Sequence, residues 1–198
     1  HKTPRRQRQM CIRDRDIVSA AKQLMNAPEG SAGGFTTGGT DSITMAVKAC
    51  RDWAVAQGRN PVGLRIIAAE TAHPAFNKAA HLMNLEVVRT PVRNDFTADP
   101  AAIEAAIDDA TIMVVASAPC FPYGLVDPVP EIAATAAGRG IWCHVDACVG
   151  GYFLPFAEQL GVDVPPWDFR NPGVCSISAD LHKYGYAPKG ASTVVYRS

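Results

Sequence analysis

Short apolar runs alternate with helical segments along most of this chain, and the alternation is the strongest constraint on its fold. The runs that read as strands are Leu64–Ala69, Leu85–Thr90, Thr111–Ala116, Ile141–Asp146, Val174–Ser178 and Ser192–Tyr196. Between them lie segments with apolar residues at helical spacing. Such alternation is typical of parallel sheets covered by helices. The sequence therefore predicts an α/β fold with a mainly parallel central sheet flanked by helices.

Polar residues follow several of these runs. His73 comes shortly after Leu64–Ala69, Asp146 ends the run that starts at Ile141, and His182 and Lys183 follow Val174–Ser178. Loops at the carboxyl ends of parallel strands commonly bind ligands. We therefore expect these side chains to share one site.

Lys183 lies in a polar loop bounded by glycine, within the stretch Ser176–Gly190. A His-Lys pair in such a loop is ordinarily a solvated surface pair. A lysine amine placed beside a binding site can instead form a Schiff base with an aldehyde cofactor. This stretch alone does not decide between the two interpretations.

A Gly-Gly-Thr turn at Gly38–Thr40 opens a long helical segment. Free N–H groups and the helix dipole at such a start favour a bound phosphate. Plain capping of the helix by Thr40 or Asp41 is the alternative.

His73 and Asp146 each have a local explanation as well. His73 could cap or pack against the next helix, and Asp146 could cap a helix or form a salt bridge. His144 and Asp146 also resemble metal ligands, but no third ligand lies at suitable spacing, so we expect no metal.

Taken together, these parts match what pyridoxal 5'-phosphate requires. A lysine holds its aldehyde, a carboxylate keeps its ring nitrogen protonated, a flat side chain stacks on its ring, and a helix start binds its phosphate. We therefore predict pyridoxal phosphate as the cofactor.

From about Gly33 to Tyr196 the chain also resembles the sphingosine-1-phosphate lyases, within the group II pyridoxal-phosphate decarboxylases. The resemblance is sharpest in four motifs, Thr37–Ser42, Ala72–Ala80, His144–Cys148 and Ser176–Gly190. It implies the aminotransferase-like large domain of fold type I.

The resemblance also implies a role for each site residue. Lys183 would be the Schiff-base lysine, Asp146 would pair with the pyridine nitrogen, and His73 and Cys148 would lie on opposite ring faces. The phosphate of the cofactor would be bound by Gly39, Thr40 and His182, with help from Ser178. Lys189 would contact the phosphate of the substrate.

The implied reaction is retro-aldol cleavage of a phosphorylated long-chain base to a fatty aldehyde and phosphoethanolamine. One alternative is an amino-acid decarboxylase of the same fold, which would release carbon dioxide. Another is a non-catalytic fragment that retains the fold.

Family members are roughly twice as long as this chain, so we expect the C-terminal small domain to be absent. Residues 16–198 would form the cofactor-binding domain. Residues 1–15 are rich in Arg, Lys and Gln, and we expect a disordered or foreign tail there. The resemblance implies a homodimer for the full-length protein.

Charge, hydropathy and cysteine content indicate which partners and which compartment suit the chain. The chain carries 19 basic and 19 acidic residues, so it shows no charge footprint for nucleic acid. It has no apolar run of membrane-spanning length. Six cysteines without paired spacing favour a reduced, cytoplasmic setting, although the parent protein could be anchored through a segment outside this chain.

Overall fold

The computed structural model describes residues 5–197. Within this range a seven-stranded sheet has the order β1-β7-β6-β5-β4-β2-β3. The strands are β1 (Ala32–Thr36), β2 (Arg65–Ala69), β3 (Glu86–Thr90), β4 (Thr111–Ser117), β5 (Trp142–Asp146), β6 (Val174–Ala179) and β7 (Ser192–Tyr196). Strands β3, β2, β4, β5 and β6 pair in parallel, whereas β7 is antiparallel to both β6 and β1. The predicted α/β fold with a mainly parallel sheet is confirmed.

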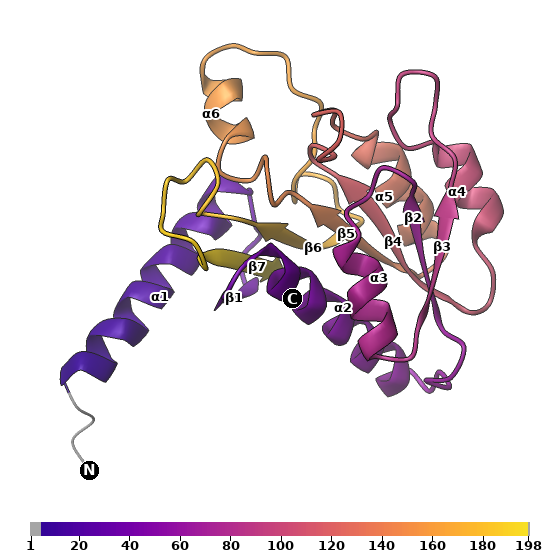
Figure 1. Ribbon diagram of the computed structural model, residues 1–198, viewed down its shortest axis with the longest axis horizontal. Coiled ribbons are helices and arrows are strands. Elements are labelled where there is room, and N and C mark those ends of the chain that lie inside the picture. Colours follow the sequence, from indigo (N-terminus) through magenta and orange to yellow (C-terminus); the bar gives the residue numbers. More distant parts are fainter. Residues whose placement is uncertain (1–4, 198) are drawn as a thin grey trace.

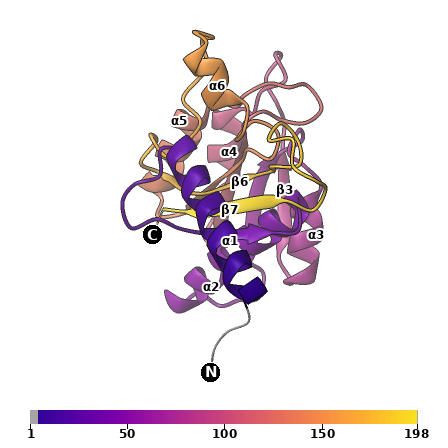
Figure 2. The ribbon, with the colours of Figure 1, turned by 90° about the vertical axis from the view of Figure 1, so that its left-hand side faces the viewer.

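Helices cover both faces of the sheet (Figures 1 and 2). They are α1 (Arg5–Leu24), α2 (Gly39–Ala56), α3 (Ala75–Leu82), α4 (Pro100–Ala106), α5 (Val129–Gly138) and α6 (Leu154–Gln159). Apolar side chains of α2 and α3 pack with one face of the sheet in a core that includes Ile43, Val47 and Phe76. The end of α1, with α4 and α5, packs against the other face around residues such as Ile103 and Ile132.

This arrangement of strands and helices brings the loops that carry the predicted site to one edge of the sheet. Strands β2, β4, β5 and β6 pair in parallel, so their carboxyl ends meet at one edge of the sheet. The loop to α3, the loop after β5 and the turn after β6 all leave from that edge. The start of α2 reaches the same edge, because β1 pairs with β7 next to β6.

Two elements lie in segments whose composition alone favours irregular structure. Residues 28–34 have the composition of a Gly/Ser-rich loop, yet strand β1 begins within them, at Ala32. The segment Tyr152–Asp168 has the proline content of an irregular loop, yet it contains the short helix α6, with Pro155 in its first turn. Proline fits there because the first N–H groups of a helix have no partner within it.

Helix α1 begins at Arg5, inside the tail expected over residues 1–15. Residues 1–4 lie outside the described residues. That residues 1–15 are foreign to the domain stays a prediction.

The close packing of β1 on α1 explains why a glycine-rich strand is tolerated. A Cβ on Gly33 would lie 2.7 Å from Cγ1 of Val18 and 3.1 Å from the carbonyl oxygen of Val194. The next residue, Gly34, has no atom within 4 Å of such a Cβ. The packing therefore requires glycine at position 33, whereas position 34 has room for a larger side chain.

We predict that Gly33→Ala destabilises the fold and that Gly34→Ala does not. Overpacking typically costs about 1–3 kcal/mol, whereas adding a Cβ where no atom lies within 4 Å should change stability by less than about 0.5 kcal/mol. Urea unfolding of the two variants measures the difference. Equal midpoints for Gly33→Ala and the unmodified chain would contradict the packing of β1 on α1.

Candidate active site

A cavity of about 190 Å³ lies at the carboxyl edge of the sheet. Its lining residues are Gly39, Thr40, Ile43, His73, Asp146, Cys148, Asp180, His182 and Lys183. Seven of the residues predicted for the site line this one cavity. Ser178 lies behind it and Lys189 lies beside it, as described below. The structure thus brings together side chains that are more than 140 residues apart in sequence.

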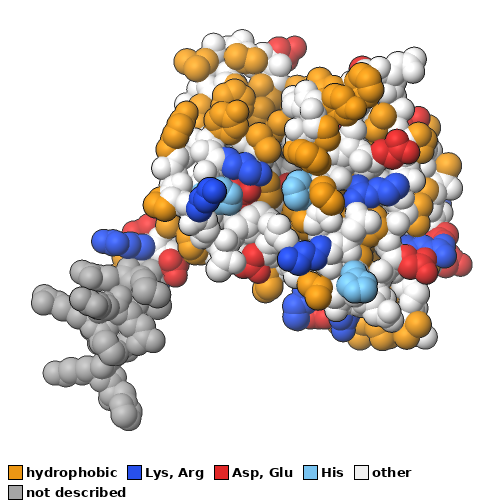
Figure 3. Space-filling model, viewed as in Figure 1, with side chains coloured by type: hydrophobic (Ala, Val, Ile, Leu, Met, Phe, Trp, Pro, Cys, Tyr) orange, Lys and Arg blue, Asp and Glu red, His pale blue; other side chains and the backbone are white. Residues whose placement is uncertain are grey.

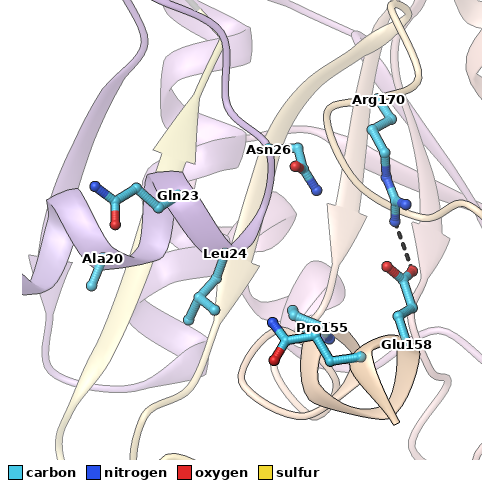
Figure 4. A pocket seen from close by; sticks show the side chains of 8 residues that line it. Ala20, Gln23, Leu24, Asn26, Pro155, Glu158 and Arg170 are labelled. Carbon is cyan, nitrogen blue, oxygen red and sulfur yellow. Dashed lines mark hydrogen bonds and ion pairs between the residues drawn. The ribbon is translucent and has the colours of Figure 1, made fainter. Parts of the chain in front are cut away.

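A larger pocket of about 620 Å³ lies elsewhere, between α1 and α6 (Figure 4). It is lined by Ala20, Gln23, Leu24, Asn26, Pro155, Glu158, Gln159 and Arg170. Its charged groups, Arg170 and Glu158, pair with each other at 2.7 Å. None of the predicted site residues lines it. The smaller cavity is the better candidate, because it holds an amine, an imidazole and buried carboxylates.

The start of α2 forms one wall of the cavity. Gly38 precedes the helix with φ 147°, a conformation that favours glycine, and no described side chain caps this helix start. Asp41 instead accepts hydrogen bonds from the N–H and hydroxyl of Thr37 at 3.0 Å. Capping by Asp41 is therefore not what the structure shows. An uncapped helix start at a cavity is suited to an anion.

Gly39 allows the closest approach within the site. A Cβ there would lie 2.6 Å from Oδ2 of Asp180 and 2.9 Å from Sγ of Cys148. Any larger residue would push α2 away from the turn after β6. The second glycine of the Gly-Gly-Thr turn is needed for this contact.

Asp146 ends β5 and is buried. Its Oδ1 accepts a hydrogen bond from the backbone N–H of Cys148 at 3.1 Å and a longer one from Oγ of Ser178 at 3.4 Å. Among the described residues it makes no ion pair, so the salt-bridge explanation is not realised. A buried carboxylate without a cationic partner is costly. It is a suitable partner for a cation supplied by a ligand.

Ser178 and His144 support that carboxylate from β6 and β5. Nε2 of His144 lies 3.2 Å from Oγ of Ser178, and its Nδ1 lies 2.7 Å from Oγ of Ser176. His144 is completely buried. Its ring nitrogens contact two serines. Among residues 12–197, whose side chains the structure describes, no group of three or more His, Cys, Asp or Glu side chains could hold a metal.

His73 and Cys148 lie on the cavity wall. Nδ1 of His73 accepts a hydrogen bond from the N–H of Ala75 at 3.1 Å, so the ring also caps α3, and Phe121 packs against it edge-on. The local explanation for His73 therefore holds, and the same ring lines the cavity. Burial, with Asp146 and Asp180 nearby, raises the pKa of Cys148 well above its usual value. Cys148 is thus a neutral thiol that packs rather than reacts.

Lys183 extends into the cavity from the turn after β6. Its Nζ lies 3.0 Å from Oδ2 of Asp180, a buried carboxylate that sequence reasoning missed. Burial alone would lower the pKa of Lys183, but the nearby carboxylates of Asp180 and Asp146 raise it above its usual value. The missed signal was the spacing of an acid three residues before the lysine.

His182 and Lys189 face the mouth of the site. Nδ1 of His182 donates to the carbonyl of Ala191 at 2.9 Å, which fixes the ring. Lys189 lines an open groove of about 630 Å³ that shares Gly39, Thr40 and His182 with the cavity. Lys189 is therefore outside the cavity but next to it, and Lys78 from α3 lines the same groove.

Comparison with known proteins identifies the family. The pyridoxal-dependent decarboxylase conserved domain matches residues 11–198, so this chain belongs to that family of pyridoxal-dependent enzymes.

Within the family, the chain is 48% identical over 183 residues to sphingosine-1-phosphate lyase 1 of Rattus norvegicus, covering 91% of this chain and 32% of the relative. It is 35% identical to a probable L-aspartate decarboxylase of Pyrococcus furiosus, covering 93% of this chain and 48% of the relative. The solved structure of a sphingosine-1-phosphate lyase from Burkholderia pseudomallei superposes with a TM-score of 0.91 at 40% identity, covering 97% of this chain and 47% of that one. The chain thus spans about a third of the length of the curated lyase and about half of the solved one.

The buried His144 leads to a prediction on pH dependence. Burial lowers its pKa to about 3, against about 6.5 in an unfolded chain. The unfolded state then binds one more proton than the folded state between these values. The contribution of this residue to stability is present above pH 6.5 and is lost as the pH falls toward 3.

We therefore expect His144→Gln to flatten the acid limb of the stability curve. The free energy of unfolding should fall less steeply with decreasing pH than in the unmodified chain, by up to about 1.4 kcal/mol per pH unit. Urea unfolding between pH 4 and pH 7 measures both slopes. Parallel slopes would show that His144 is not held neutral in the folded state.

Proposed function

We propose that this chain is the cofactor-binding part of a pyridoxal-phosphate-dependent lyase that cleaves a phosphorylated long-chain amino alcohol. The observation that carries the proposal is the cavity itself. It places the Lys183 amine, the unpaired Asp146 carboxylate and the uncapped start of α2 around one space. The identity to the lyases exceeds that to the aspartate decarboxylase, which favours the lyase over the decarboxylase.

The residues fit pyridoxal phosphate on chemical grounds. The Lys183 amine can hold an aldehyde carbon, and Asp146 lacks a cation that a protonated ring nitrogen would supply. Gly39, Thr40 and His182 would hold the phosphate, and His73 and Cys148 would contact the ring. When bound, the cofactor supplies an electron sink for a bond broken beside the substrate amine.

The protein groups have separate tasks in this function. Ser178 and the N–H of Cys148 orient Asp146, and the apolar residues around it, such as Ile43, exclude water. Lys189 places a cation in the groove outside the cavity, where a phosphate on the substrate would be neutralised. A phosphate there would orient the substrate with its amine toward Lys183.

We further propose that residues 16–198 form one cofactor-binding domain in a cytoplasmic homodimer. Free cysteines support a reducing compartment, since Cys50, Cys120, Cys143, Cys148 and Cys175 form no disulfide with one another. Exposed aromatic residues support contact with a second copy. Phe121 and Tyr184 lie on loops at the site, Phe153 and Phe156 lie at α6, and hydrophobic side chains gather over that part of the surface (Figure 3). No helix in the described range is both long and apolar enough to cross a membrane.

Lys183→Ala should abolish covalent capture of pyridoxal phosphate, because the amine that bonds to the aldehyde is removed. The measurement is borohydride reduction followed by mass spectrometry of the peptides. Lys189→Ala is the matched control, since it removes an amine from the adjoining groove and should leave the adduct on Lys183 intact. Loss of the adduct in the control but not in Lys183→Ala would reverse the assignment.

The substrate class is tested by the products. With pyridoxal phosphate and a phosphorylated long-chain amino alcohol, we expect a fatty aldehyde and phosphoethanolamine, and Lys189→Ala should weaken this substrate's binding by about tenfold or more. Carbon dioxide released from a free amino acid, without aldehyde, would favour the decarboxylase. An adduct on Lys183 without either product would favour the fragment that only retains the fold.

A further inference from the structure

Asp180 is the acidic group nearest to Lys183, and neither the sequence motifs nor the family comparison assigns it a role. It is almost completely buried at the turn after β6. Its Oδ2 lies 3.0 Å from Nζ of Lys183 and 3.6 Å from Nε2 of His182. It also lies against Gly39, at the start of α2. The carboxylate thus faces an amine, an imidazole and a helix start.

A chain of buried hydroxyl groups fixes the other oxygen of this carboxylate. Oγ of Ser192 donates to Oδ1 of Asp180 at 2.6 Å and lies 2.7 Å from Oγ of Ser42. Ser42 in turn lies 2.6 Å from Oγ1 of Thr36. These residues come from β7, α2 and β1, so three elements hold the carboxylate in one orientation. Such buried networks rigidify a site when every member is satisfied.

We propose that Asp180 is a positioning residue that holds the Lys183 amine, as an ammonium ion, at the cavity wall beside the start of α2 before any cofactor enters. This proposal deepens the proposed function and rests on it for its biological meaning. Lys183 has a partly exposed, flexible side chain, and the ion pair replaces that freedom with one position. The charged amine does not attack aldehydes, so the pair also keeps the lysine unreactive until the ammonium loses its proton.

The groups facing Lys183 come from each neighbouring element. Asp180 and His182 belong to the turn after β6, Asp146 and Cys148 to the end of β5, and His73 to the loop before α3. Cys148 is neutral. Asp146 is directed toward Ser178 and its own loop. Asp180 is therefore the acid in direct contact with the amine, and its removal should change the titration of Lys183 most.

The test is trace acetylation of the cofactor-free chain across pH 7–11, with the extent at each lysine read by mass spectrometry. Free amine reacts and ammonium does not, so the midpoint reports the ionisation of each lysine. In the unmodified chain, the Lys183 midpoint should lie above that of exposed Lys78. A midpoint at or below that of Lys78 would overturn the proposal, and this comparison needs no variant to fold.

Asp180→Asn keeps the shape and removes the charge. We expect the Lys183 midpoint to fall by about one pH unit or more, and capture of pyridoxal phosphate to begin at correspondingly lower pH. Asp168→Asn is the matched control, because Asp168 is equally buried and pairs with Arg170 away from the site. An unchanged Lys183 midpoint in Asp180→Asn, or an equal shift in the control, would overturn the proposal.

Ser192→Ala tests the hydroxyl chain. It leaves the Asp180 charge but removes the hydrogen bond that aims it, so the midpoint should fall by less than in Asp180→Asn. No shift would show that the hydroxyl chain does not position the carboxylate. Acetylation needs no cofactor, so failure of the proposed cofactor function would appear as absent adduct with the midpoints unaffected.

Discussion

Two buried carboxylates, Asp146 and Asp180, line the same cavity as the Lys183 amine, and the rest of the site depends on how these charges are placed. Burying a charge is costly unless it is paired or hydrogen-bonded. Asp180 is paired with Lys183 and fixed by Ser192, whereas Asp146 has hydrogen bonds but no cation among the described residues. The sheet supplies this difference, because the ends of β5 and β6 hold the two acids at fixed positions one strand apart. A ligand that brings a cation to Asp146 and an aldehyde to Lys183 completes the arrangement.

The extent to which the sequence predicted this arrangement varies by element. The buried strands β2, β4, β5 and β6 were evident, because both of their faces are covered and apolar residues predominate in their runs. Strand β1 was missed, because Gly33 and Gly34 carry no strand signal and are tolerated through packing against Val18 and pairing with β7. Helix α6 was missed because six residues with a proline give no period to read.

The residues of the candidate site likewise divide into those that the sequence predicted and those that it missed. Lys183, Asp146, His73 and the Gly-Gly-Thr turn were found because each is an unusual residue in its local pattern. Asp180 was missed because an acid near a lysine is common in loops. Its importance comes from contacts with Gly39 and Ser192, which are distant in sequence and meet only through the pairing of β7 with β6. The pairing of Asp180 with a cation, and the lack of such a pair at Asp146 among the described residues, likewise depend on three-dimensional contacts.

The start of α2 shows how local stability is given up at this site. A side-chain cap would contribute about 0.5–2 kcal/mol to the helix, yet Gly38 provides none and Asp41 bonds to Thr37 instead. Gly39 adds a further local cost, because glycine inside a helix start is entropically unfavourable. Both departures leave backbone N–H groups open to the cavity and let α2 approach Asp180. An anion bound there would stabilise the folded state by mass action. The uncapped helix and the close glycine are therefore features that a ligand can offset and that packing alone does not explain.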